Sequence, residues 1–454
     1  MSEKISPLDF RKNAAKAVEN TSLRQAMRTA TDMFISKRNE GLSSVPIETW
    51  RDQASAIRLD VLDHLPEYVD KFSFHATRAG AVVHRARDAQ TAREVIRDIL
   101  RDHGARKIVK AKSMITEEMR LNEYLEESGF HVVETDLGEY IVQIAGEKPS
   151  HILAPAIHKT RRQVGELFSE KLSVPYSDDP FVLTKIARTV LREEFLTADA
   201  GISGANFAVA DSGSLAIFTN EGNGRMVTTL PRLHIAALSI EKIIPTLNDL
   251  SLFARLLPRS ATGQILSSYL SIITGSRKPG ESTGTRELHI VLLDNGRSEI
   301  LGGKYREILK CIRCSACFNV CPVYRTIGGH AYGVTYPGPM GIVLTSLLEG
   351  MGGTYPLVDA TTLCGACVEV CPVRVPLVKL LTMLREERVD KGMTSFAERA
   401  AMNTYGLSTG NRRLFSLGQR ISKVLWPTLN KINSKGIINR LPKPASQSFG
   451  QKNR

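Results

Sequence analysis

The sequence predicts an α/β domain followed by a helical domain that holds every cysteine of the chain. Three observations lead to this prediction. The chain has 454 residues, which is enough for two or three domains. Short β-branched runs alternate with helix-like stretches from about residue 71 to 297, which is typical of a sheet covered by helices. All seven cysteines then lie between Cys311 and Cys371, among helix-like segments.

The first segment, residues 1–70, is expected to be mostly helical. Polar and apolar residues alternate at helical spacing from Phe10 to Phe34, with few turn signals. Such a segment fits an arm or a lid, and the sequence assigns no chemistry to it.

The second segment, residues 71–297, is expected to contain a largely parallel sheet. Lys107 to Lys110 is typical of a strand, the helix that follows ends near Gly129, and His131 to Glu134 is typical of the next strand. This strand–helix–strand order implies parallel strands with helices on both faces. Further along, Asp211-Ser-Gly213 predicts a turn between two apolar runs.

A glycine-rich loop, Asn220 to Gly224, follows the second of these apolar runs. Gly222-Asn-Gly224 matches part of a dinucleotide fingerprint, but the third glycine is missing, and the chain has no G-x-x-x-x-G-K-[ST] motif. The usual sequence signals for NAD, flavin and ATP are therefore absent. The loop is either a plain surface turn or a place where backbone amides, helped by Arg225, bind a carboxylate or a phosphate.

Several polar residues near predicted strand ends are candidates for catalysis. They are Glu134, Asp136, Glu139, His151 and His158. Residues of these types are more often solvated or capping groups than catalytic ones, and the sequence does not single out one of them.

The helical domain is predicted over residues 298–400, and its first cysteine run has the spacing C-x2-C-x2-C-x3-C-P of bacterial ferredoxins. The run consists of Cys311, Cys314, Cys317 and Cys321, followed by Pro322. Three thiolates that are separated by two residues each can wrap three corners of one four-iron cluster, and in this pattern the fourth thiolate serves a second cluster. His330, in a loop nearby, could also reach a cluster, although a loop histidine is more often a surface group.

The second run, Cys364, Cys367 and Cys371, matches the last three cysteines of the same pattern, and Thr361 stands where the first cysteine would fall. The pattern therefore predicts two [4Fe–4S] clusters whose ligands are exchanged between the runs. The first cluster is assigned Cys311, Cys314, Cys317 and Cys371. The second is assigned Cys321, Cys364 and Cys367, and it lacks a fourth cysteine.

Structural zinc is the alternative, because C-x-x-C pairs also build zinc sites. Zinc needs four ligands at each site and gives no reason for the x3 spacing before proline. An odd number of cysteines in a chain without a secretory signal argues against disulfides. The interval between Cys321 and Cys364 is too long for a small ferredoxin. It fits an α-helical ferredoxin domain with helices inserted between the two runs.

The net charge of +13 is concentrated in the tail, residues 401–454, which holds ten Lys or Arg and no Asp or Glu. The nearly neutral body argues against a nucleic-acid-binding protein. The tail is expected either to meet an anionic membrane surface or acidic partner or to act as a solubilising disordered segment. No run approaches 18 apolar residues and the N-terminus lacks an apolar signal core, so a cytoplasmic location is expected.

Several stretches of the α/β segment resemble the lactate-utilisation (LUD) domain family. They are Glu134 to Tyr140, Pro155 to Lys159, Ser203 to Leu215, Thr219 to Arg225 and Pro231 to Ala236. Together with the cysteine runs, residues 70–400 resemble the lactate-utilisation protein B (LutB) family, the iron–sulfur member of a three-protein L-lactate oxidation system. The resemblance implies an N-terminal fold similar to the sugar-phosphate isomerase and CoA-transferase type (NagB/RpiA/CoA-transferase-like), two four-iron clusters, and LutA-like and LutC-like partners.

The expected function is electron transfer during oxidation of L-lactate to pyruvate, within a complex. The sequence shows no flavin or other hydride acceptor. Two other functions stay open. In one, the three-cysteine site leaves an iron open to substrate oxygens, and the chain is itself an enzyme that uses a Lewis acid. In the other, the LUD-like domain only docks a partner.

Overall fold

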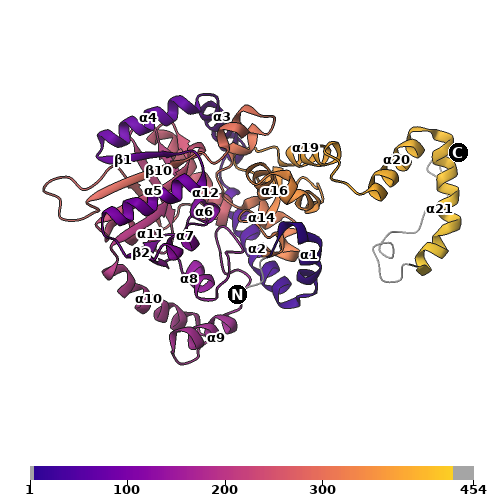
Figure 1. Ribbon diagram of the computed structural model, residues 1–454. Helices are drawn as coiled ribbons and strands as arrows, with labels where there is room; N and C mark the ends of the chain where they lie inside the picture. The colour runs from indigo at the N-terminus through magenta and orange to yellow at the C-terminus, as the bar shows by residue number, and fades with distance from the viewer. Residues whose placement is uncertain (1–4, 433–454) are drawn as a thin grey trace. The chain divides into compact units, whose positions relative to one another are not determined.

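The computed structural model describes residues 5–432 of the chain. These residues belong to two compact units, Met1–Arg385 and Glu386–Arg454, which are described separately (Figure 1). The first unit contains all the described strands and all seven cysteines.

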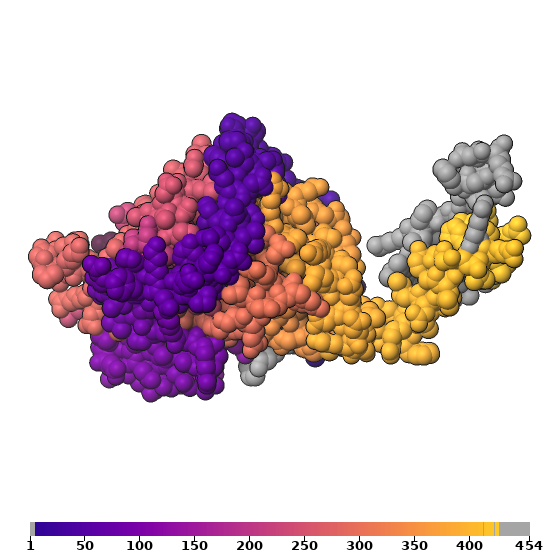
Figure 2. Space-filling model, turned by 90° about the horizontal axis from the view of Figure 1, so that it is seen from above, coloured from indigo at the N-terminus to yellow at the C-terminus, as the bar shows by residue number. Residues whose placement is uncertain are grey.

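Helices open the first unit, as the spacing of residues 1–70 predicts. They are η1 (Pro7–Asp9), α1 (Phe10–Glu19), α2 (Thr21–Leu42), α3 (Ile47–Asp63) and α4 (Leu65–Arg78). Asn20 caps α2, because its side chain accepts a hydrogen bond from the backbone N–H of Leu23 at 2.9 Å. Figure 2 shows the segment as an indigo band that lies against the rest of the first unit.

The core of the first unit is a sheet with the strand order β1-β10-β7-β4-β2-β3. Its strands are β1 (Ala81–Ala86), β2 (Lys107–Lys110), β3 (His131–Glu134), β4 (Ala200–Gly204), β7 (Leu233–Ser239) and β10 (Glu287–Leu293). All neighbouring strands run parallel, which confirms the predicted parallel sheet. Because parallel strands end at the same edge, the loops that follow them gather there.

Alternate residues of the strands face opposite layers of helices. In β10, Leu288 and Ile290 share a core with α4, whereas Val291 and Leu293 share a core with α5 (Ala89–Asp102). This alternation is the period of two that a strand imposes on its side chains. The other helices of this part are α6 (Met114–Glu118), α7 (Leu121–Glu127), α8 (Leu137–Ile144), α9 (Arg161–Leu172), α10 (Pro180–Thr197), α11 (Asn223–Thr229), α12 (Leu247–Thr262) and α13 (Arg297–Gly302).

A smaller sheet with the order β8-β5-β6-β9 shares the core on the α4 side. Its strands are β5 (Phe207–Val209), β6 (Ser214–Thr219), β8 (Ile243–Ile244) and β9 (Tyr269–Ile273). β5 and β6 pair antiparallel around the turn predicted at Asp211–Gly213. Gly213 has a φ of +67°, and a Cβ there would lie 2.2 Å from the backbone nitrogen of Ala76, so this turn requires glycine.

The cysteine-containing part is helical, as predicted. Its elements are η3 (Arg306–Lys310), α14 (Ala316–Val320), α15 (Tyr324–Ile327), η4 (His330–Tyr332), α16 (Gly338–Leu348), α17 (Met351–Thr354), η5 (Tyr355–Asp359), α18 (Ala366–Glu369) and α19 (Leu377–Asp390). The elements from α15 to η5 all lie between Cys321 and Cys364, so the expected insertion of helices between the two runs is confirmed.

The second unit contains α20 (Phe396–Gly410) and α21 (Arg412–Ile432) within the described residues. Arg388 forms an ion pair with Glu398 at 2.8 Å. Between residues 5 and 432, no helix has the length and apolar character needed to span a membrane. The end of the tail, for which the sequence predicts disorder, lies outside the described residues.

Candidate functional site

The first group of cysteines surrounds one small cavity. Cys311, Cys314 and Cys317 of the first run line it together with Cys371 of the second run. Met340 of α16 completes part of the wall. The structure thus brings together the four residues that the sequence assigns to the first cluster.

The second group consists of Cys321, Cys364 and Cys367. Burial, followed by the nearby thiols of Cys321 and Cys364, raises the pKa of Cys367 to about 12. Cys364 is exposed, and hydrogen bonding by the Thr362 side chain lowers the pKa of its thiol. The three cysteines assigned to the second cluster are therefore close enough to interact electrostatically, and their group is open to solvent at Cys364.

The two cysteine runs have the same backbone conformation at corresponding positions. The residue before the second cysteine of the pattern has a positive φ in both runs, 59° at Arg313 and 54° at Leu363. The residue after that cysteine does too, 59° at Ser315 and 88° at Gly365. Left-handed residues other than glycine cost about 1–2 kcal/mol each, and such strain gathers at ligand-binding sites. The second run therefore folds as the first does, although it has one cysteine fewer.

Thr361 takes the position of the missing cysteine. In the first run, the backbone N–H of Arg313 donates a hydrogen bond to Cys311 Sγ at 3.4 Å. In the second run, the backbone N–H of Leu363 donates to Thr361 Oγ1 at 3.1 Å. The same hydrogen bond is made to oxygen in place of sulfur, so the Thr361 side chain lies where a fourth ligand would come from.

The thiols of the first group are in surroundings that suit a metal cluster. Burial raises the pKa of Cys314 to about 12 and raises that of Cys317 well above its usual value. Thiolates in such surroundings need a strong positive partner, which bound iron supplies. The backbone N–H of Val375 donates to Cys371 Sγ at 3.2 Å, and hydrogen bonds to sulfur are a regular feature of iron–sulfur sites. The residues present therefore fit an iron–sulfur cluster.

Helices α2 and α3 support the second cysteine run. Arg51 of α3 donates hydrogen bonds to the carbonyl oxygens of Cys371 at 2.9 Å and Val368 at 3.1 Å. Arg38 of α2 donates to the carbonyl oxygen of Val370 at 3.3 Å. The N-terminal segment is therefore an arm that holds the cysteine loops, and the alternative of a lid finds no support in these contacts.

A buried ion-pair network joins the α/β part to the first cysteine run. Glu241 is fully buried and pairs with Arg297 at 2.8 Å and with Arg313 at 3.2 Å. Burial alone would raise the pKa of Glu241, but the two guanidinium groups outweigh it and hold the pKa at about 2. The buried ion pair between Arg313 and Glu241 thus links the loop between Cys311 and Cys314 to the α/β part.

A second, larger cavity of about 250 Å³ lies at the carboxyl ends of β2, β3, β4 and β7. The loops after these strands contribute Lys112, Ser113, Asp136, Asn206, Ser239 and Lys242 to its wall. The glycine-rich loop contributes Asn220, Glu221 and Asn223, whereas Arg225 is exposed and is not among the lining residues. Arg313 and Tyr336 reach the same wall from the cysteine-containing part. The cavity therefore borders both halves of the first unit.

The acidic residues singled out in the sequence lie in two places. Asp136 lines the large cavity and pairs with Lys112 at 2.9 Å. Glu134 and Glu139 are buried, and Glu134 pairs with Lys110 at 2.7 Å. Only Asp136 of the three is placed to meet a ligand in this cavity.

The histidines singled out in the sequence lie elsewhere. His151 is buried and forms a hydrogen bond with Asn319 of α14 at 3.2 Å. The rings of His158 and His330 are 4.4 Å apart, and His158 contacts Glu147 at 2.7 Å. His330 is not among the residues that line the first cysteine group. The structure does not bring these histidines and the acids together into one catalytic group.

The three basic residues of the large cavity, Lys112, Lys242 and Arg313, were not singled out from the sequence. Lys112 follows β2, Lys242 ends the turn η2 (Ile240–Lys242) after β7, and Arg313 lies inside the first cysteine run. The rule that open parallel sheets bind ligands beyond the carboxyl ends of their strands would have selected the two lysines. Nothing in the sequence places Arg313 near them.

Known proteins resemble the chain over almost its whole length. Residues 69–293 match the family model of the LUD domain, and residues 307–375 match that of the 4Fe-4S dicluster domain. The chain is 42% identical over 450 residues to lactate utilization protein B of Bacillus licheniformis, and the aligned region covers 98% of this chain and 94% of that protein. It is 43% identical over 423 residues to lactate utilization protein B of Bacillus subtilis, and the aligned region covers 92% of this chain and 88% of that protein.

The crystal structure of a DUF162 family protein from Deinococcus radiodurans also matches, and the match covers 50% of this chain and 98% of that protein's chain. Its TM-score of 0.30 and sequence identity of 16% are too low to support the fold. The two family models do support it, and they confirm the predicted α/β LUD domain followed by a helical ferredoxin domain. The cysteine-containing part is an iron–sulfur domain. The chain therefore belongs to the lactate utilization protein B family.

Proposed function

We propose that the chain is an iron–sulfur electron-transfer protein in the oxidation of L-lactate to pyruvate, and that it holds two [4Fe–4S] clusters. Cys311, Cys314, Cys317 and Cys371 hold the first cluster. Cys321, Cys364 and Cys367 hold the second, with Thr361 or a group from outside the chain as its fourth ligand. The link to lactate is supported by the relatives, which are named lactate utilization protein B.

One observation carries this proposal: the two cysteine runs repeat one backbone conformation and exchange a cysteine. Cys371 of the second run lies among the cysteines of the first. Positive φ values recur at corresponding positions on both sides of Cys314 and Cys364. Exchange of the last cysteine is the pattern of two-cluster ferredoxins, whereas separate zinc sites give no reason for it.

Charged residues of the chain influence the reduction potential of the clusters. When bound, each cluster accepts and releases one electron. Arg313 lies between two first-cluster ligands and is held by Glu241 at 3.2 Å. Lys242 lies within electrostatic reach of Cys311, and burial lowers the pKa of Lys242 to about 7. Positive charge near a cluster favours its reduced form, because reduction adds a negative charge.

The proposed setting is a cytoplasmic complex with LutA-like and LutC-like proteins. Oxidation of lactate releases two electrons as a pair, and clusters take electrons singly. A partner must therefore hold the group that first accepts the pair, since the sequence shows no signal for a flavin or nicotinamide site.

The enzymatic alternative needs a substrate site beside the incomplete cluster. The large cavity borders Arg313 of the first run, whereas the incomplete group is the one that contains exposed Cys364. The cavity is thus beside the cluster with four cysteines, which favours electron transfer over Lewis-acid catalysis.

The test is anaerobic purification of the chain, alone and with its LutA-like and LutC-like partners. The chain should contain about eight iron atoms and as much acid-labile sulfide. L-Lactate should reduce the clusters in the complex and leave them oxidised in the isolated chain. Two zinc atoms per chain without sulfide would refute the clusters, and clusters that stay oxidised in the complete complex would refute the role in lactate oxidation.

A further inference from the structure

The large cavity of the α/β part has the size and the place of a small-molecule site. Its volume of about 250 Å³ lies below the range of roughly 300–1,000 Å³ that is usual for drug-sized ligands, so it suits a smaller molecule. It lies beyond the carboxyl ends of β2, β3, β4 and β7, where open α/β sheets generally bind ligands.

The wall contains three basic side chains, Lys112, Lys242 and Arg313, and two acidic ones, Asp136 and Glu221, of which Glu221 is exposed. Lys112 pairs with Asp136 at 2.9 Å, and Arg313 pairs with Glu241 at 3.2 Å. No residue in the described part of the chain forms a hydrogen bond or ion pair with Lys242 Nζ. Lys242 is therefore the basic group of the wall that is left to meet an anion, and the carboxylates of Asp136 and Glu221 in the same wall disfavour a ligand with more than one negative charge.

The rest of the wall combines neutral polar groups with apolar side chains. The hydroxyl and amide groups belong to Ser113, Asn206, Thr219, Asn220, Asn223 and Ser239. The apolar side chains belong to Ile115, Leu153, Ile217, Phe218, Leu238 and Leu257. Such a wall fits a short carbon skeleton that carries one further polar substituent beside its acid group.

We propose that this cavity binds a small 2-hydroxy or 2-oxo monocarboxylate, with the carboxylate on Lys242. This inference rests on the proposed function, and it adds a binding site on this chain for the acid that is oxidised or formed. Arg313 lines the cavity and also lies between Cys311 and Cys314. A bound anion therefore changes the electric field at the first cluster and leaves the second cluster largely unaffected.

The test uses the full chain with both clusters in place, kept free of oxygen. Calorimetry with pyruvate and with L-lactate should show one site per chain, and inorganic phosphate should not compete. Pyruvate should also shift the EPR signal of one reduced cluster and leave the other unchanged. Lys242→Met should weaken pyruvate binding by about tenfold or more, because a charged hydrogen bond is lost, and Lys242→Arg should retain part of the affinity.

Lys185→Met, at an exposed position of α10, is the matched control and should bind pyruvate like the native chain. Should Lys242→Met lose iron, Ser113→Ala removes a wall hydroxyl and is expected to weaken binding about three- to tenfold. A chain with eight iron atoms that binds neither acid overturns the site and leaves the clusters intact. Unchanged binding in Lys242→Met, with only a shifted cluster potential, would show that Lys242 balances cluster charge alone. Phosphate binding of equal strength would overturn the carboxylate class.

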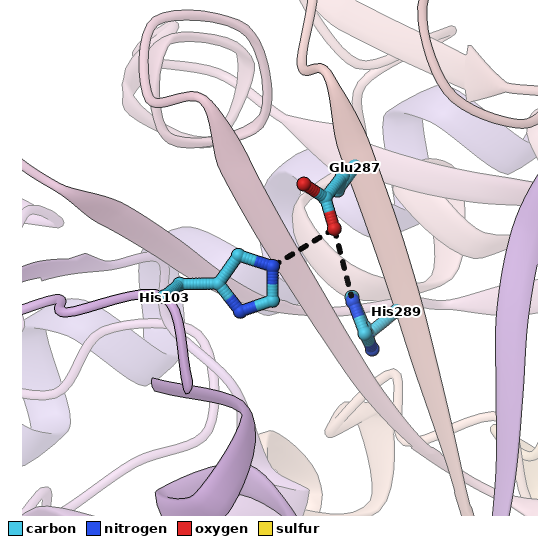
Figure 3. Close-up of side chains that lie close together, drawn as sticks. All are labelled: His103, Glu287 and His289. Carbon is cyan, nitrogen blue, oxygen red and sulfur yellow. Dashed lines mark hydrogen bonds and ion pairs between the residues drawn. The ribbon is translucent and has the colours of Figure 1, made fainter. Parts of the chain in front are cut away.

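A second, independent inference concerns three side chains that converge beside β10: Glu287 and His289 lie on this strand, and His103 follows α5 (Figure 3). Glu287 Oε2 lies 2.8 Å from His103 Nε2 and 3.9 Å from His289 Nε2, and the three ligand atoms all lie within 4.8 Å of one another. His289 is buried to more than nine-tenths, and its Nε2 has no hydrogen-bond partner among the described residues. An unpartnered buried nitrogen that points at a carboxylate indicates a missing ligand.

The other ring nitrogens of both histidines are engaged in the way that metal ligands require. His103 Nδ1 lies 2.7 Å from the carbonyl oxygen of Ile99, which can only accept, so Nδ1 carries the proton and Nε2 is free to bind a metal. His289 Nδ1 contacts His84 Nε2 at 3.0 Å. Hydrogen bonds of this kind fix the orientation of metal-binding imidazoles.

The geometry points to a zinc site formed by His103, Glu287 and His289, with a water as the fourth ligand. Two imidazoles and one carboxylate are a known ligand set for zinc with an open position. This site does not involve the cysteines, so it is independent of the proposed function.

Zinc K-edge absorption on the cluster-loaded chain distinguishes this site from zinc at the cysteines. Nitrogen and oxygen ligands near 2.0–2.1 Å are expected, in contrast to about 2.3 Å for sulfur. His289→Ala should lower zinc affinity by at least tenfold, because one of three protein ligands is lost. The control is His131→Ala, whose side chain is 65% exposed and outside the site. Sulfur ligation, or equal affinity in both variants, would overturn the proposal.

Discussion

At the scale of single residues, Thr361 is the point where the two cysteine runs differ. Its Oγ1 accepts the hydrogen bond that Cys311 Sγ accepts in the first run. A neutral hydroxyl is a poor ligand for iron in a sulfur-rich cluster, where thiolate is preferred. The iron nearest Thr361 should therefore be the most weakly held of the second cluster.

Thr361→Cys should make the second cluster more resistant to oxidation. The local backbone already has the conformation of the first run, so the new thiol would lie where the proposed second cluster lacks its fourth cysteine. We expect slower formation of the three-iron EPR signal during controlled exposure to air. Thr361→Ser keeps a hydroxyl and is the matched control, and it should lose iron as fast as the native chain. Equal rates in the cysteine and serine variants would show that another ligand holds this iron.

The exchange of cysteines between the runs predicts that a variant in one run damages the cluster formed mainly by the other run. Cys371→Ser should damage the first cluster, because Cys371 lies in the cavity of the first run. Cys321→Ser should damage the second cluster, although Cys321 belongs to the first run. EPR spectra of the two reduced variants separate the cases. If each variant lost the cluster of its own run, the ligand assignment would be wrong.

The buried carboxylate of Glu241 is expected to stabilise the fold. Glu241→Gln leaves Arg297 and Arg313 without their shared carboxylate, and loss of one partner from a buried ion pair costs about 3–5 kcal/mol. The folded-state pKa of about 2 lies below the ordinary 4.5, so this stabilisation is present above about pH 4.5 and is lost as the pH falls toward 2. The midpoint of thermal denaturation under argon at pH 7 should fall clearly. Glu299→Gln, at an exposed position of α13, should leave it unchanged.

At the scale of helices and strands, the N-terminal helices are supports for the cysteine loops. Arg51→Met removes hydrogen bonds to the carbonyl oxygens of Cys371 and Val368, and unsatisfied carbonyls cost about 1–3 kcal/mol each. The variant should lose iron faster to a chelator, measured as bleaching of the visible absorption. Arg28→Met, on an exposed position of α2, should keep the native rate. Equal rates would mean that α3 does not stabilise the clusters.

Local patterns were sufficient to predict several of the strands and one of the turns. Lys107–Lys110 and His131–Glu134 are strands as expected, and the turn at Asp211–Gly213 joins two strands. Each of these features depends on residues close together in the sequence. The role of Arg51 could not be predicted, because helical spacing shows that a helix has a buried face but not what that face contacts. The same holds for Lys242 and Arg313, which meet only after the chain has folded.

At the scale of the whole molecule, the tail differs in charge from the rest of the chain: the tail is strongly basic, and the rest is nearly neutral. The described part of α21 carries exposed Leu414, Leu417, Ile421 and Val424 at helical spacing, and the tail contains no acidic residue. A helix with an apolar stripe and basic neighbours is typical of segments that lie on an anionic surface.

Deleting residues 412–454 should therefore weaken association with an anionic surface and leave iron content unchanged. Co-sedimentation with vesicles rich in phosphatidylserine, and separately with the LutA-like and LutC-like partners, measures this at low and at high salt. The difference between the full and the shortened chain should be large at low salt and shrink as salt screens the charges. Replacing Leu417 and Ile421 by serine keeps every charge, so this variant separates the apolar from the electrostatic contribution. Equal association of the full and shortened chains with vesicles and with partners would show that the tail is only a solubilising segment.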